Sequence, residues 1–170
     1  MIVDISALKD LPLSLALNED AARLAKLDKG VILLGQVFAD LNVMQGDHIY
    51  YFTGHTRCDA NMICSRCAES YRTTLQGEVD FSIREVDDGR PVDMDDVPEN
   101  ELLVPANATQ VDITTPVREA LILAIPLQPL CREDCRGICP ICGVNRNEKS
   151  CDCKVEKTDS RWDGLRDLLK

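Results

Sequence analysis

Val31-Ile32-Leu33-Leu34-Gly35-Gln36-Val37-Phe38 is rich in aliphatic, β-branched and aromatic residues, which is typical of a β-strand. Ile49-Tyr50-Tyr51-Phe52-Thr53 repeats this character, and Gln45-Gly46-Asp47 between the two stretches has the composition of a turn. Further along the chain, residues 71–75 and 78–83 alternate polar with apolar side chains. These patterns predict an antiparallel sheet with one covered face.

A first helix is predicted over residues 18–29, before this sheet region. Asn18 suits its N-cap, because the side-chain oxygen can accept a hydrogen bond from an early backbone N–H. Ala21 and Leu24 share one face, and Gly30 is suited to the position after the last turn.

Two further helices are predicted in the second half of the chain. Thr115 suits an N-cap and Pro116 the first helical position, and Pro126 ends the apolar spacing that follows. Near the end, Asp159 can cap a short helix that carries Trp162 on its apolar side. The predicted fold class is therefore α+β: an antiparallel sheet with a few helices and a C-terminal cysteine-rich segment.

Charge is unevenly distributed along the 170 residues. Residues 1–130 carry 10 Lys and Arg against 21 Asp and Glu, whereas residues 131–170 carry 9 against 8. The segment 85–101 holds eight acids and one base, Arg90, and this composition favours a solvated acidic loop over a segment that docks on a basic partner. The formal net charge of −10 disfavours a protein that coats nucleic acid over its whole surface. We expect an α+β body over residues 1–130, with a cysteine-rich zinc-binding segment and C-terminal helix over residues 131–170 packed on it as one domain.

The chain contains nine cysteines, an odd number that cannot pair completely. The N-terminal residues lack the basic and apolar segments of a secretion signal, and no apolar run is long enough to span a membrane. We therefore expect a cytoplasmic protein with reduced thiols. Clustered thiols in that setting indicate metal ligands first and redox chemistry second.

The cysteine spacing predicts two four-thiolate zinc sites. A C-x2-C pair presents two thiolates to one tetrahedral ion, and a second pair at loop distance completes the coordination. The predicted ligands form two sets, one of Cys64, Cys67, Cys131 and Cys135, the other of Cys139, Cys142, Cys151 and Cys153. An alternative pairs Cys131 and Cys135 with the C-x2-C pair that follows them, although only three residues separate the two pairs. Cys58 is left over and is interpreted as a small buried apolar residue.

No catalytic signature accompanies the cysteines. The sequence has no phosphate-binding loop, nucleophile elbow or H-E-x-x-H motif. His48 and His55 are interpreted as surface or packing residues, because eight thiols suffice for two ions. Redox use of a C-x2-C pair is disfavoured, because such a pair usually opens a helix, whereas Cys67 precedes strand-like residues and Cys142 precedes Gly143. The prediction is a non-enzymatic binding protein.

Several motifs resemble the family of the bacterial large ribosomal RNA subunit accumulation protein. Cys64-Ser65-Arg66-Cys67 is similar to its C-x-R-C element, and Cys131-Arg132-Glu133-Asp134-Cys135-Arg136-Gly137-Ile138-Cys139-Pro140-Ile141-Cys142-Gly143-Val144-Asn145 to its C-x-x-D-C-x-G-L-C-P-x-C-G-x-N signature. Asn147 and Asp159-Ser160-Arg161-Trp162 continue the resemblance, although Ser160 stands where the usual member has proline. The resemblance implies a role without catalysis in the accumulation or processing of large-subunit (23S) ribosomal RNA during ribosome biogenesis.

The expected partners are a ribosomal RNA precursor or ribosome-assembly proteins, with no membrane and no small-molecule substrate. Direct RNA binding needs a cationic face, and the C-terminal segment offers several Arg and Lys residues. The acidic body suits a basic protein partner better. Two alternatives stay open at this point, a thiol–disulfide redox protein and a general zinc-ribbon module that binds nucleic acid.

Overall fold

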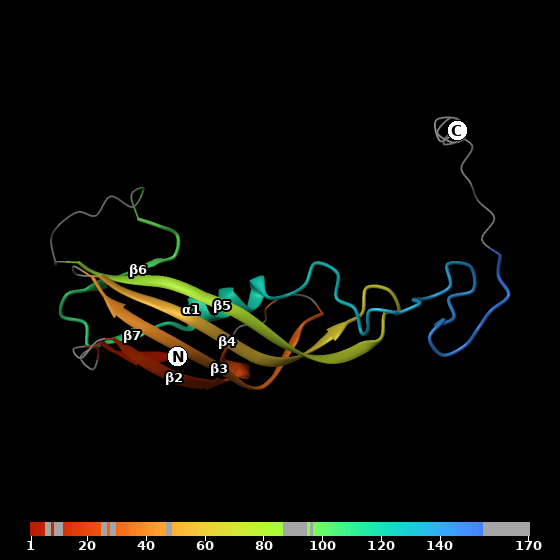
Figure 1. Cartoon of the computed structure of the whole chain (residues 1–170), viewed down its shortest axis with the longest axis horizontal. Helices are drawn as coiled ribbons and strands as arrows, with labels where there is room; N and C mark the ends of the chain where they lie inside the picture. Colours follow the sequence, from red (N-terminus) through yellow and green to blue (C-terminus); the bar gives the residue numbers. More distant parts are fainter. Residues whose placement is uncertain are drawn as a thin grey trace.

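The computed structural model describes residues 1–5, 8, 12–24, 27, 30–46, 49–86, 95 and 97–154. In Figure 1 the strands form an elongated body, and the cysteine-rich segment extends from the end of the body remote from β6 and β7. The strands are β1 (Ile2–Asp4), β2 (Leu13–Asp20), β3 (Ile32–Gln45), β4 (Ile49–Ile63), β5 (Ser70–Val86), β6 (Glu101–Pro105) and β7 (Gln110–Asp112). The helical elements are a 3-10 turn, η2 (Ala21–Arg23), and one α-helix, α1 (Thr114–Leu123).

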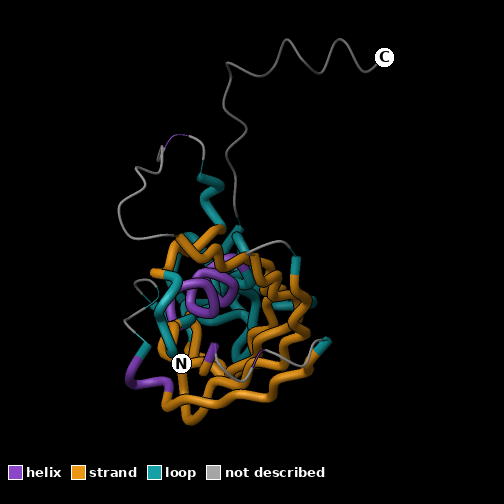
Figure 2. Tube along the Cα trace, turned by 90° about the vertical axis from the view of Figure 1, so that its left-hand side faces the viewer, coloured by secondary structure: helices purple, strands orange, loops and turns teal. Residues whose placement is uncertain are grey.

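The main sheet has the strand order β2-β3-β4-β5-β6. The predicted antiparallel pairing is present in β3, β4 and β5. Two strands outside the prediction extend the sheet: β2 lies antiparallel to β3, and β6 lies parallel to β5, so the sheet is mixed. A second sheet consists of β1 and β7 in antiparallel pairing. Figure 2, viewed from one end, shows α1 within the curve of the strands.

Alternation along the strands places the core on the concave inner face. In β3, every second residue from Val37 to Val43 is buried, whereas Phe38, Asp40 and Asn42 between them are exposed. Helix α1 covers this face with Val117, Ala120 and Leu121, all buried. The helix approaches β5 so closely at Gly77 that a Cβ there would lie 2.3 Å from the Ala120 carbonyl oxygen. Glycine at this position therefore sets the distance between helix and sheet.

The helix predicted over residues 18–29 is wrong for the part that the structure describes. Asn18 lies in β2 and pairs with Phe38, and only the 3-10 turn follows the strand. The cap is Asp20, whose carboxylate accepts a hydrogen bond of 2.9 Å from the Ala22 N–H. The few apolar residues at helical spacing were not enough to form a helix, because the strand β2 half-buries alternate residues against the core.

Other boundaries also differ from those predicted. Helix α1 begins at Thr114, and the Asp112 carboxylate accepts the Thr114 N–H at 2.9 Å, so Thr115 is not the cap. The ends of the predicted acidic loop belong to β5 and β6, where Arg84 and Glu101 form an ion pair of 2.9 Å. The helix predicted after Asp159 lies outside the described residues. In the described part of the chain, no helix has the length and apolar character needed to cross a membrane.

Candidate metal centres

The structure brings the eight predicted cysteines together in two groups of four. The first cluster consists of Cys64, Cys67, Cys131 and Cys135, and the second cluster of Cys139, Cys142, Cys151 and Cys153. Within each cluster the four Sγ atoms all lie within 4.8 Å of one another. These are the two sets that the spacing favoured, and the alternative pairing of the central cysteines with the following pair is not the observed arrangement.

The sulfur separations in the first cluster match a tetrahedral thiolate site. The Sγ atoms of Cys64 and Cys135 are 3.8 Å apart, and those of Cys67 and Cys131 are 3.7 Å apart. Four sulfurs about 2.3 Å from one central ion would lie about 3.8 Å from one another. A disulfide would require about 2.05 Å. The donor set therefore fits one tetrahedral ion that prefers sulfur ligands.

The turn between β4 and β5 supplies half of the first cluster. Cys64 follows the last residue of β4, and the chain reverses through Ala68, which has a positive φ of 60°. The Ala68 N–H donates to the Cys64 carbonyl, and the Cys64 N–H donates to the Glu69 carbonyl, both at 2.9 Å. Cys64 is 1% exposed and Cys67 is 4% exposed, so both thiols are held in a dry, fixed turn.

Backbone hydrogen bonds join this turn to the segment that follows α1. The Ser65 N–H donates to the Pro129 carbonyl at 2.8 Å, and the Ile138 N–H donates to the Arg66 carbonyl at 3.0 Å. The Arg66 guanidinium also donates to the Cys135 carbonyl at 3.1 Å. Gly137 has a φ of 69°, and a Cβ there would lie 2.8 Å from the Arg66 carbonyl oxygen, so only glycine fits this approach.

The second cluster lies farther from the sheet and is more open. Cys139 is 1% exposed, Cys142 is exposed, and Cys151 and Cys153 are half-buried. The Cys139 N–H donates to the Val144 carbonyl at 2.8 Å, and the Gly143 N–H donates to the Cys139 carbonyl at 2.9 Å. These bonds close a tight turn that presents the two thiols of the C-x2-C pair on one side.

Asn147 links the two clusters, a role that the sequence analysis did not identify. Its amide nitrogen donates to the Cys135 Sγ at 3.3 Å, and its amide oxygen accepts the Arg136 N–H at 2.8 Å. Donation by Asn147 is the main cause that lowers the pKa of the Cys135 thiol. Asn147 follows the turn of the second cluster but contacts a sulfur of the first. The sequence shows Asn147 only as a position of the family motif, and the motif does not indicate that its side chain contacts the Cys135 thiol.

Both clusters contain thiols with a lowered pKa next to thiols with a raised pKa. Burial raises the pKa of Cys64, but backbone N–H donors outweigh burial and lower it to about 6, whereas burial and neighbouring thiols raise the pKa of Cys131 to about 12. In the second cluster, backbone N–H donors, the first from Cys142, lower the pKa of Cys139 to about 6. The Cys142 thiol and burial raise the pKa of Cys153 to about 12. Four adjacent thiolates repel one another, and a divalent cation at the centre would remove this conflict.

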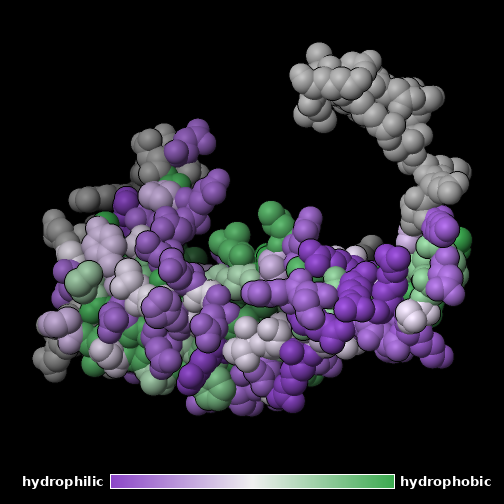
Figure 3. Space-filling model, turned by 45° about the vertical axis from the view of Figure 1, so that its right-hand side comes forward, coloured by the Kyte–Doolittle hydropathy of each residue, from purple (hydrophilic) through white to green (hydrophobic). Residues whose placement is uncertain are grey.

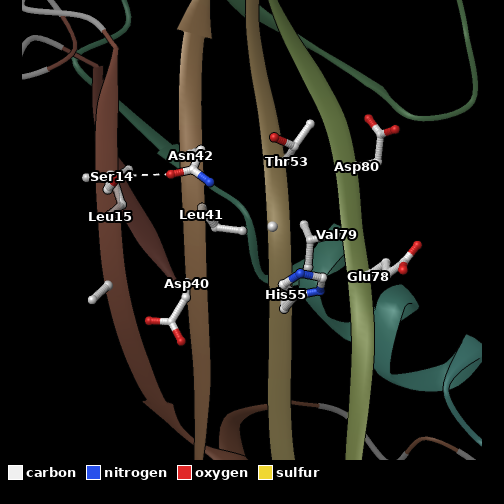
Figure 4. Close-up of a pocket in the computed structure, with 12 residues that line it drawn as sticks. Ser14, Leu15, Asp40, Leu41, Asn42, Thr53, His55, Glu78, Val79 and Asp80 are labelled. Carbon is white, nitrogen blue, oxygen red and sulfur yellow. Dashed lines mark hydrogen bonds between the residues drawn. The ribbon is translucent and has the colours of Figure 1, made fainter.

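Cys58 and His55 belong to neither cluster. Cys58 is 2% exposed, and burial raises the pKa of its thiol, in agreement with its interpretation as a small buried residue. His48 lies outside the described residues. His55 is exposed on the outer face of the sheet, in register with Asp40 and Glu78. Figure 4 shows this shallow polar hollow, which no cysteine lines.

Comparison with known proteins places the chain in a family. A family model described as "Large ribosomal RNA subunit accumulation protein YceD" matches residues 52–169, a range that includes all eight clustered cysteines. No solved structure matches the chain significantly.

Among the relatives, two plant proteins are named "Large ribosomal RNA subunit accumulation protein YCED homolog 1, chloroplastic". The Arabidopsis thaliana protein is 33% identical over 70 residues and the Zea mays protein 36% identical over 70 residues, in both cases 41% of this chain and 22% of the relative. An uncharacterized protein of Mycobacterium tuberculosis is 27% identical over 146 residues, 86% of this chain and 66% of the relative. The matched region thus spans about a fifth of the plant proteins and just under two thirds of the mycobacterial one. Because the family model matches well over half of its residues, the chain belongs to the family of the large ribosomal RNA subunit accumulation protein YceD.

Proposed function

We propose that this protein is a non-enzymatic, zinc-binding cytoplasmic factor that supports the accumulation or processing of large-subunit (23S) ribosomal RNA in ribosome biogenesis. The observation that carries the proposal is the family match, which spans most of β4, all of β5 to β7, α1 and both cysteine clusters. The proposal therefore treats these elements and the two clusters as one unit of function.

Zinc is the proposed ion in both clusters. Four cysteine thiolates in a tetrahedron are a typical structural zinc site, and they leave no open position for a reactive water. In the first cluster, zinc would hold the turn after β4 against the segment after α1. Each occupied site would carry a charge of −2, so it also needs N–H donors of the kind that Asn147 and the turn backbones supply.

The local backbone supports a structural role for the thiols over redox catalysis. Cys67 is followed by Ala68 in a left-handed conformation and then by β5. Cys142 is followed by Gly143, which has a φ of 71°. Each C-x2-C pair therefore ends in a tight turn, and neither opens the kind of helix that activates the first thiol of a redox pair.

The test of the cellular role is a deletion strain with complementation. We expect the deletion to lower the ratio of 23S to 16S ribosomal RNA and to reduce large subunits on a sucrose gradient. The unsubstituted chain and Cys58→Ser should restore both, whereas the double change Cys64→Ser and Cys67→Ser should not. An unchanged ratio in the deletion strain would contradict the proposed role.

Metal content tests the zinc assignment separately. Elemental analysis of protein purified without added metal should give two zinc ions per chain, and Cys58→Ser should leave this value unchanged. One ion would confine zinc to a single cluster. A metal-free chain with a reactive, low-pKa thiol pair would instead support the redox alternative.

A further inference from the structure

A groove with an apolar floor and an acidic rim lies between α1 and β6. Its volume is about 220 Å³, which is enough room for a large apolar side chain. Leu102 of β6 and Pro116, Ala120 and Leu123 of α1 contribute apolar surface. Four acids also line the groove, and they are Glu78, Asp80, Glu99 and Glu119.

The apolar surface continues past the end of the helix. Leu123 is 85% exposed, and Leu127, four residues further along the chain, is fully exposed. Figure 3 shows apolar side chains that stand out from the middle of the upper edge of the molecule. Leu123 lines the groove and Leu127 follows it four residues later, so their exposure next to an apolar groove indicates a contact surface.

The charge around the groove selects the chemistry of the partner. Among the described residues that line it there is no Lys or Arg, and residues 1–130 carry 21 acids against 10 bases. RNA phosphates would be repelled here, and so would a second copy of the same acidic face. A segment with positive side chains on either side of an apolar one would complement both the rim and the floor.

We propose that this groove binds a basic polypeptide segment, with one apolar side chain inserted between α1 and β6 and Lys or Arg side chains placed against the four rim carboxylates. The expected partner is a basic protein that presents an amphipathic segment. The inference goes beyond the proposed role in RNA accumulation and does not depend on it, because no cysteine of either cluster lines the groove.

The test is fluorescence anisotropy at 150 mM salt with a labelled 14-residue peptide of Lys and Leu in amphipathic order. Two matched peptides serve as ligand controls, one with Glu in place of Lys and one with Ser in place of Leu. We expect Leu123→Ser and Glu119→Lys to weaken binding of the Lys/Leu peptide at least tenfold. Both side chains are exposed, so circular dichroism should show the unsubstituted fold in each variant.

Matched variants on another surface separate groove binding from general attraction to an acidic protein. Glu148→Lys and Met44→Ser make comparable changes at exposed residues that do not line the groove, and they should alter the Kd less than threefold. Equal weakening by these variants, or equal binding of the Ser-containing peptide, would overturn the proposal. So would binding of a labelled single-stranded RNA, or a concentration-dependent dimer, that Leu123→Ser abolishes. None of these outcomes bears on the RNA levels that test the cellular role.

Discussion

Replacement of Asn147 by alanine should weaken zinc binding at the first cluster about 10- to 100-fold. The Asn147 amide nitrogen lies 3.3 Å from the Cys135 Sγ, which would be a thiolate in the occupied site. A hydrogen bond to a charged group contributes about 1.5–3 kcal/mol, which corresponds to about 10- to 100-fold in affinity or slightly more. Loss of a partner that orients a metal ligand costs a similar factor in other metal proteins.

The rate of zinc release to a colorimetric chelator measures this effect on each site. With two occupied clusters, release should follow two phases. Asn147→Ala should accelerate the phase of the first cluster by about 10- to 100-fold. This assumes that the loss of affinity appears entirely in the rate of zinc dissociation. The other phase should change less than threefold, since the Asn147 side chain bonds to Cys135, Arg136 and Asn145 and not to a thiol of the second cluster.

Two further variants make the interpretation specific. Asn147→Asp keeps the shape and an oxygen for the Arg136 N–H, but it removes the donor and adds a negative charge beside the sulfur. It should weaken the site at least as much as alanine, whereas a purely steric role would tolerate it. Asn107→Ala, in an exposed turn, should behave as the unsubstituted chain. Release rates for Asn147→Ala within twofold of the unsubstituted chain, or equal acceleration of both phases, would refute the reasoning.

Three other predictions concern the tail, the helix contact and pH. Cys139→Ser should make the C-terminal segment sensitive to limited proteolysis, as a chelator should do for the unsubstituted chain, because metal binding contributes folding free energy there. Identical digestion patterns for the variant, the unsubstituted chain and the chelator-treated chain would contradict this. Gly77→Ala should lower the free energy of unfolding by about 1–3 kcal/mol in urea denaturation, because the new Cβ would lie 2.3 Å from the α1 backbone. An unchanged denaturation midpoint would show that α1 can move away from β5 without cost. The Thr74 hydroxyl and then the Arg72 guanidinium hold the pKa of Asp59 below its ordinary value of 3.8, so Asp59 stabilises the fold above that pH and less as the pH falls through the lowered pKa. Asp59→Asn should therefore reduce stability at pH 7 but much less at pH 3, and an equal loss at both pH values would contradict the ionic origin.

The grouping of the second cluster was predictable because its ligand geometry is local. A C-x2-C pair closes a tight turn, and a second pair at short loop distance completes a tetrahedron. For the first cluster, spacing favoured the observed set but left an alternative, because its two pairs are 64 residues apart. The antiparallel strands were predictable for a similar reason, since a two-residue alternation allows only one way to bury the apolar side chains. The acidic excess of residues 1–130 could also be read directly.

The failures occurred where distant contacts outweighed local preference. Residues 18–20 have a plausible helix cap, but pairing with β3 and burial of the leucines before them placed them in a strand. The parallel pairing of β6 with β5 was also not predictable from the sequence. The length of the segment between the two strands does not indicate in which direction β6 runs.

Sequence spacing alone determined the C-x2-C pairs, the close partners of the second cluster and the apolar face of the central strands, because all of these follow from short repeats or short loops. Only the tertiary structure decided that Cys131 and Cys135 join Cys64 and Cys67, that Asn147 donates to a sulfur of the first cluster, and that α1 and β6 enclose a groove with an acidic rim. These features join residues between 12 and 71 positions apart, and no local rule constrains the approach of such segments. They arise from the packing of the whole chain, where burial of the shared core sets the positions of the surface groups.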